Sequence, residues 1–455
     1  MTMVATVPAV TVSATIAMAT RRPMFFALRI NSTRSHPRTK TLRSEATANH
    51  MNGPALGTPP EACCLDALDL WVSRMTDPPT LEGRLRAVLR VHGEMRRVRE
   101  PLGMALCRLT LTALVSNAPV PPRSRRRAER ASQALLESGR LDWACRALAQ
   151  EGRIAILAQE WLRAGTLLAT AYELGARSVK PVPASVWANL LRNAGYVAWT
   201  LGNVKRARIN WQGALDVAQE GGLDDVAAAA HTGVGLCDWA QGDAAAGYVH
   251  ASAALSWYRS VDRRTDVAQG LLNAALMLED FGYWQDVVVL LSEALDVALS
   301  VDEREIAADA SAELVHAHIA LSRLPAAHEA LGRARQLLEG GSHTAASLAD
   351  LNLAEGHLRL AEGRVQEALW CFRAAREAVG STNRPLVTGR VLTEVSVAIH
   401  ATATRLDAAR EMVEVLHAMD RRSLLGPPRR VFASAEPEPT AVAPESLTAT
   451  ATGDA

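Results

Sequence analysis

The sequence predicts an all-α protein built as a solenoid of antiparallel helix pairs. A Gly or another small residue returns about every forty positions within the same helical pattern, and such a period is typical of stacked supersecondary units. The composition agrees, because the chain is poor in aromatic residues (4%) and rich in alanine and leucine. The periodic positions, which we call marks, are Gly202, Gly242, Gly282, Ser322, Gly363 and Thr404.

Residues 1–55 are expected to be a disordered extension, or a stretch ahead of a natural translation start at Met51. They hold one acidic residue, Glu45, beside several arginines, so an organelle transit peptide is the alternative. A secretory signal does not fit, because the uncharged run precedes Arg21 and Arg22 instead of following them.

Residues 56–120 are expected to form a separate N-terminal helical region. Apolar residues at helical spacing predict three helices, at about 64–75, 81–95 and 102–113. Asp77, Pro78 and Pro79 followed by Thr80 indicate a turn and a helix cap between the first two. The segment A-P-V-P-P at 118–122 is the clearest linker, and the solenoid is expected to begin after it.

Residues 121–425 are assigned to the solenoid, in which each unit is expected to hold two helices. In the first regular unit Gly202 ends one helix by supplying a left-handed backbone, and a second helix follows. Small residues recur where two helices must approach closely: Gly195, Gly235, Ala275, Val315, Gly356 and Val397 before the marks, and Ala207, Gly247, Val287, Ala327, Ala368 and Ala409 after them. A large residue fills the remaining gap in most units: Trp211, Leu291, Leu331, Phe372 and Val413.

Residues 426–455 are rich in Pro, Ala, Thr and Glu and contain no basic residue after Arg430. We expect this tail to be disordered, because it offers no apolar periodicity to bury.

Residues 193–218 read N-A-G-Y-V-A-W-T-L-G-N-V-K-R-A-R-I-N-W-Q-G-A-L-D-V-A, and this pattern resembles the tetratricopeptide repeat. The resemblance covers residues 187–418 well and 123–176 loosely. It implies a right-handed superhelical solenoid in which the first helix of each pair lines a concave, ligand-binding face. The period here is 40 or 41 residues where the family has about 34, so each helix is longer, and the family's closing Pro is missing. Units of this length are similar to those of bacterial regulatory proteins, including peptide-sensing regulators.

Charge and cysteine content exclude several classes of protein. The net charge of +1 argues against a general nucleic-acid binder, and no segment reaches the ~18 apolar residues that span a bilayer. The six cysteines lack metal-binding spacing, so we expect buried free thiols and a cytoplasmic protein.

We expect no catalytic residues, cofactor or metal. None of the three lysines completes a P-loop, and neither G-x-S-x-G nor H-E-x-x-H occurs. His316 and His318 point about 200° apart on a helix and cannot chelate one ion. His316 and His357 share a slot in neighbouring units, where polar lining is favoured over a metal site.

A basic run at a predicted helix start is the strongest charge cluster: Arg123, Arg125, Arg126, Arg127 and Arg130. It is a candidate nucleic-acid contact. The favoured interpretation is solvated arginines beside a linker, because no aromatic residues interleave with the run.

The concave face is the best candidate for ligand binding. Asn193 and Asn273 hold the same slot two units apart, and an amide side chain can pair with both N–H and C=O of an extended peptide. The alternative is that both asparagines are hydrogen-bonded within the helix stack. The candidates are Asn189, Arg192, Asn193, Tyr196, Trp199, Leu236, Trp239, Gln269, Asn273, Glu279, Asp280 and His316.

The sequence therefore predicts a protein- or peptide-binding scaffold without catalytic activity. The alternative is a transcription-related regulator whose solenoid senses a peptide or partner and whose basic N-terminal region contacts DNA or a partner.

Overall fold

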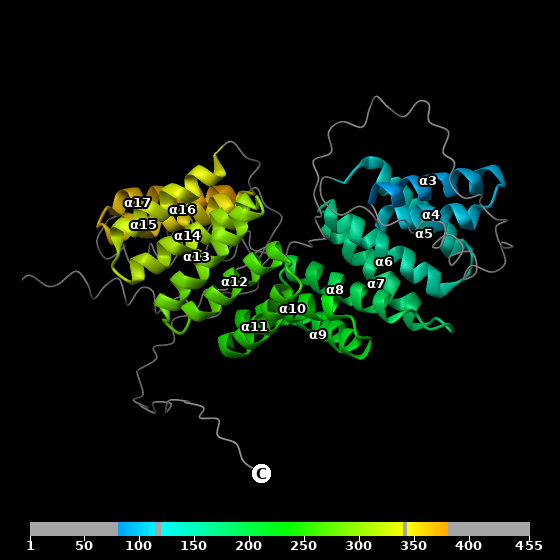
Figure 1. The fold of residues 1–455 in the computed structure, drawn as a ribbon, viewed down its shortest axis with the longest axis horizontal. Coiled ribbons are helices and arrows are strands. Elements are labelled where there is room, and N and C mark those ends of the chain that lie inside the picture. The colour runs from blue at the N-terminus through cyan, green and yellow to red at the C-terminus, as the bar shows by residue number, and fades with distance from the viewer. Residues whose placement is uncertain (1–80, 114–119, 340–343, 381–455) are drawn as a thin grey trace, which may run out of the picture. The chain divides into compact units, whose positions relative to one another are not determined.

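The computed structural model describes residues 81–113, 120–339 and 344–380, all within the first of two compact units, which ends at Ala409. Every regular element in these ranges is an α-helix (Figure 1). The helices are α3 (Leu81–Arg97), α4 (Pro101–Ala113), α5 (Pro122–Glu137), α6 (Leu141–Leu157), α7 (Trp161–Ala176), α8 (Ala184–Thr200), α9 (Val204–Glu220), α10 (Asp224–Ala240), α11 (Ala244–Ser260), α12 (Arg264–Glu279), α13 (Trp284–Ser300), α14 (Arg304–Ala320), α15 (Leu324–Leu338), α16 (Ala345–Ala361) and α17 (Val365–Gly380). Within the described ranges, none is long and apolar enough to cross a bilayer.

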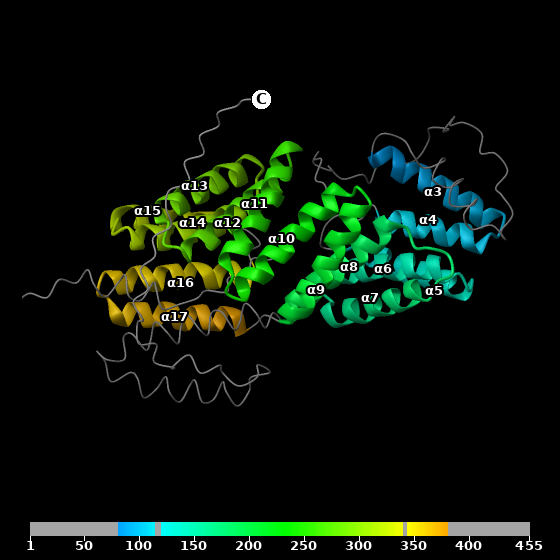
Figure 2. The ribbon, with the colours of Figure 1, turned by 90° about the horizontal axis from the view of Figure 1, so that it is seen from below.

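The forty-residue period arises from two helices of nearly equal length. From α8 to α14 each helix has 16 or 17 residues, and links of three or four residues join them. Each helix packs on the next in the sequence, as both views show (Figures 1 and 2). We call the first helix of each pair (α8, α10, α12, α14, α16) an A-helix and the second a B-helix. The same spacing already holds for α6 and α7, where the match to the repeat pattern is loose.

The marks within the described residues end the A-helices as expected, whereas Thr404 lies outside those residues. Gly202, Gly242, Gly282 and Gly363 have φ values between 72° and 95°, and Ser322 has φ 56°. A second periodic set of residues with positive φ lies in the links between the helix pairs and was not predicted. Its members are Gly222, Asp262 and Asp302, with φ of 63°, 51° and 58°. Aspartate is among the few non-glycine residues that tolerate this conformation, so the second set carries a weak sequence signal.

Side-chain caps start two of the B-helices. Asn203 Oδ1 accepts a hydrogen bond from the backbone N–H of Arg206 at 3.0 Å, and Asp243 Oδ1 accepts one from Ala246 at 2.9 Å. These bonds satisfy backbone donors that have no partner within the helix, so the residue after the mark fixes where the B-helix begins.

The small residues of the described units lie where helices cross, as predicted, whereas Val397 and Ala409 lie outside the described residues. Trp211 is 1% exposed and lies between two glycines: a Cβ on Gly195 would come within 2.5 Å of its ring, and one on Gly233 would overlap it. Gly235 and Gly247 face each other so closely that a Cβ on either would lie 2.8 Å from the carbonyl oxygen of the other.

The N-terminal helices share an apolar cluster with α5 and α6. Val91, Met95, Leu106, Leu135 and Trp143 are among its members. Helices α3 and α4 match the expectations for 81–95 and 102–113, while the expected helix at 64–75 lies outside the described residues. The expectations for residues 1–55 and 426–455 also lie outside them, and the domain boundaries stay predictions.

The described cysteines are buried free thiols, as expected: Cys107, Cys145, Cys237 and Cys371. Burial raises the pKa of Cys107 to about 12 and that of Cys145 to about 11. These thiols are therefore protonated and unreactive at neutral pH.

Candidate functional site

The twelve residues predicted to line the inner face all lie on A-helices or directly after one. Eight are buried: Asn193, Tyr196, Trp199, Leu236, Trp239, Asn273, Glu279 and His316. Asn189, Arg192 and Gln269 are half-buried, and Asp280, which follows α12, is exposed. These residues thus lie on one set of helices, but most of their side chains are buried in contacts between helices.

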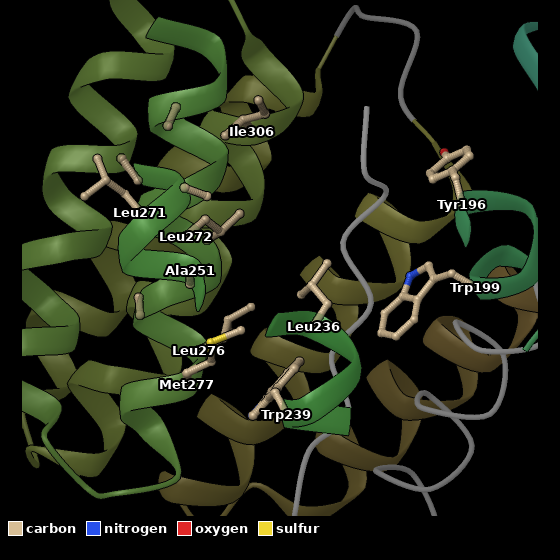
Figure 3. Close-up of a cluster of buried hydrophobic side chains, with 14 of the residues drawn as sticks. Tyr196, Trp199, Leu236, Trp239, Ala251, Leu271, Leu272, Leu276, Met277 and Ile306 are labelled. Atoms are coloured by element: carbon tan, nitrogen blue, oxygen red, sulfur yellow. The ribbon is translucent and has the colours of Figure 1, made fainter. Parts of the chain in front are cut away.

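The buried aromatic residues join helices both within a pair and between neighbouring pairs. Tyr196 meets Trp161 edge to face, with ring centroids 5.8 Å apart, and Trp199 lies 5.8 Å from Trp211. Trp239 donates from Nε1 to Asp280 Oδ2 at 2.7 Å, which ties α10 to the end of α12. Figure 3 shows Tyr196 and Trp199 of α8 and Trp239 of α10. These side chains fix the stacking of the A-helices.

The two asparagines keep unused hydrogen-bond donors. Asn193 Oδ1 accepts a long hydrogen bond from Arg192 Nη2 at 3.5 Å, and Asn273 Oδ1 accepts one from Gln269 Nε2 at 3.3 Å. Within the described part of the chain, neither Nδ2 donates to a partner. By contrast, Asn189 donates to Ser185 O of its own helix at 2.8 Å.

Arg192 lies among charged groups that the sequence did not indicate. Burial lowers the pKa of its guanidinium, while the fields of Asp225 and Asp266 raise it and that of Arg263 lowers it again. Arg263 is itself paired with Asp266 at 2.7 Å. Asp225 and Asp266 lie in the first turns of α10 and α12, where acidic residues are common. In the sequence they therefore indicate where helices start, and not that they lie near Arg192.

His316 and His357 meet as their shared slot predicts. Their ring centroids are 5.0 Å apart, and His357 also contacts Phe372 edge to face at 5.3 Å. Within the described residues, no group of three or more His, Cys, Asp and Glu is placed to hold a metal ion. The histidines act here as packing and polar groups.

A second histidine pair was not predicted. His231 Nδ1 and His250 Nδ1 are 2.7 Å apart across α10 and α11. Asp238, which accepts from Arg208 Nε at 2.6 Å, lies 3.9 Å from His250 Nε2. The two nitrogens can share only one proton between them, so the contact requires at least one neutral ring.

We expect the free energy of unfolding to fall as the pH drops below about 6.5, partly through this pair. Burial, and then the charge of His250, lower the pKa of His231 from 6.5. The unfolded chain therefore binds more protons, so this contribution is complete above 6.5 and is lost as the pH falls. In urea unfolding followed from pH about 7.5 to 5.5, His231→Gln should lessen the loss, by at most about 1.4 kcal/mol per pH unit. A pH slope equal to that of the wild type would contradict this role.

The basic run divides between two faces of α5. Arg125 forms an ion pair with Glu160. The positive charge of Arg127 instead reaches His92 on α3, and that of Arg130 reaches Arg108 on α4. Successive residues are turned by 100° around a helix, so Arg125 and Arg127 cannot share a face. Arg123 and Arg126 are exposed.

Comparison with known proteins shows which solved structures have a similar fold. No family model and no curated protein sequence matches the chain. Among solved structures, it is similar to a Rap protein complexed with competence and sporulation factor, with 12% identity and a TM-score of 0.57, over 78% of this chain and 98% of that one. It is also similar to NprR in complex with its cognate peptide NprX, with 12% identity and a TM-score of 0.52, over 70% of this chain and 87% of that one.

The chain therefore has the fold of a tetratricopeptide-repeat-like solenoid. The predicted all-α class and the predicted antiparallel helix pairs are both confirmed.

Proposed function

We propose that the protein is a peptide- or protein-binding scaffold without catalytic activity, and that A-helices α8 to α12 carry the binding site. The observation that carries this proposal is the pair of asparagine amides, Asn193 and Asn273, whose Nδ2 atoms have no partner within the described residues. A purely structural asparagine would use its donors within the protein, as Asn189 does in its hydrogen bond to its own helix.

The spacing of the two amides suits an extended ligand. They hold the same slot in the first and third regular pairs, and the slot between them is Gly233, where the Trp211 ring packs against the backbone. Each amide can pair with a peptide unit through its N–H and C=O groups. Arg192 and Gln269 donate only long hydrogen bonds to the two asparagine oxygens, so a bound ligand replaces weak contacts at these oxygens.

Arg192 supplies a cation next to Asn193. The one hydrogen bond of its guanidinium among the described residues is the long one to Asn193, so its remaining side-chain donors are available to a carboxylate. The two similar structures, which are complexes with a factor and with a cognate peptide, support a peptide ligand. The buried thiols support a reducing, cytoplasmic location.

Replacing both Asn193 and Asn273 with Ala should weaken partner binding by about 1–3 kcal/mol, because each loses hydrogen bonds to the ligand backbone. The partner is first captured from lysate on the immobilised full chain and identified. Its affinity is then measured by calorimetry for the wild type and the double variant.

A matched control replaces Asn210 on α9 and Asn352 on α16 with Ala. The Asn352 amide already donates to Leu348 O at 2.8 Å, so the control changes the same chemistry outside the proposed site. If the Asn193/Asn273 variant is stable and binds like the control, this site is wrong. If it melts much lower, the asparagines are structural.

A further inference from the structure

The first helices of the described chain carry a large excess of positive over negative charge. Residues 81–137 hold twelve arginines and five acidic residues, a net charge of +7, whereas the whole chain has a net charge of +1. An asymmetry of this size indicates a polyanionic partner for the charged part. The basic run on α5 accounts for only a part of this excess of positive charge.

The fold brings arginines from three helices together. Helix α4 packs against both α3 and α5 (Figure 1). Burial lowers the pKa of His92, and the positive fields of Arg108, Arg127 and Arg96 lower it further; burial, and then the field of Arg130, lower the pKa of Arg108. Because such fields fade over about 10 Å, these groups form one surface, which we call the α3–α5 basic surface.

No carboxylate neutralises this surface within the described residues. Arg96, Arg108, Arg127 and Arg130 form no ion pair or hydrogen bond there. The nearby acids are engaged elsewhere: Glu94 with Arg97 at 3.0 Å, Glu129 with Arg163 at 2.7 Å, Glu100 with the backbone N–H of Leu102 and Glu137 with Gln133. Unpaired like charges on packed helices repel one another and so favour a bound anion.

Residues 81–137 contain no Phe, Tyr or Trp. Protein interfaces rely on aromatic anchors, and single-stranded nucleic acids need aromatic stacking platforms. Contacts to a duplex backbone need neither, because arginine forks bind phosphate oxygens directly. The positive end of α5, where Pro121 provides no side-chain cap, adds to the attraction.

We propose that the α3–α5 basic surface binds the phosphate backbone of duplex nucleic acid. This site is separate from the one proposed on the A-helices, and it requires no base-specific contact. It is a second activity of the same chain.

The test is fluorescence anisotropy of the full chain with a labelled duplex of about 20 base pairs, at about 50 and 200 mM salt. The wild type should bind, and more weakly at high salt. The variant Arg108→Gln/Arg127→Gln/Arg130→Gln should lose about tenfold or more in affinity. Its salt slope should fall by about 2–3, since each phosphate contact contributes about 0.9.

A control triple variant, Arg259→Gln/Arg264→Gln/Arg333→Gln, removes the same charge from exposed arginines on α11, α12 and α15 and should bind like the wild type. If Arg108→Gln disturbs packing, the exposed Arg96 replaces Arg108 in the test variant. In NMR titrations the pKa of His92 should rise when duplex is added, because phosphate opposes the arginine fields. Equal loss in both triple variants, no binding at low salt, or tighter binding to polyglutamate than to duplex would each overturn the proposal.

Discussion

Trp211→Ala is expected to destabilise the protein by about 3–5 kcal/mol, more than any other single substitution proposed for this chain. Trp211 is almost fully buried between the Gly195 and Gly233 backbones, so truncation leaves a cavity that two helices line. It also removes the hydrogen bond from its Nε1 to Arg192 O at 3.0 Å. Urea unfolding followed by circular dichroism measures the loss.

Trp370 on α17 provides the matched control, because its side chain is 67% exposed. Trp370→Ala should change the free energy of unfolding by no more than about 0.5 kcal/mol. Similar losses for the two variants would show that Trp211 does not fill the space between α8 and α10.

Gly247→Ala should destabilise the protein by about 1–3 kcal/mol, although alanine favours helices. The added Cβ would lie 2.8 Å from Gly235 O and 3.1 Å from Trp239 Cβ. The first of these is a backbone atom, so relief requires α10 and α11 to move apart. Thermal unfolding gives the sign and size of the effect.

The same substitution at Gly332 should have the opposite sign. A Cβ there meets nothing within 4 Å, so Gly332→Ala should gain about 0.5–1 kcal/mol from helix propensity alone. Two effects of the same sign would contradict the assignment of residue 247 to a close helix crossing.

The repeat architecture could be predicted because each unit needs the same turn and the same close helix contacts at the same spacing. Gly202 and its equivalents end A-helices, and Gly195 makes room for Trp211, so both recur at the same offsets. The turns at Asp262 and Asp302 escaped prediction because aspartate suits many conformations besides the left-handed one.

The candidate site could be predicted only in part, because accessibility depends on how the units stack. The sequence places Trp239 on the inner face, but its bond to Asp280 shows that stacking uses this side chain. The contact of His231 with His250 and the approach of Arg108 to α5 join residues 19 or more positions apart. No periodic signal marks such pairs, because each depends on the tertiary fold.

Hydrogen–deuterium exchange of the full chain, with and without its captured partner, tests binding on the A-helices most directly. We predict that the partner slows exchange in α8, α10 and α12 and leaves B-helices α9 and α11 unchanged. Backbone amides report this protection whether or not the asparagine substitutions disturb folding. Protection confined to α3–α5, or to the B-helices, would contradict binding on the A-helices.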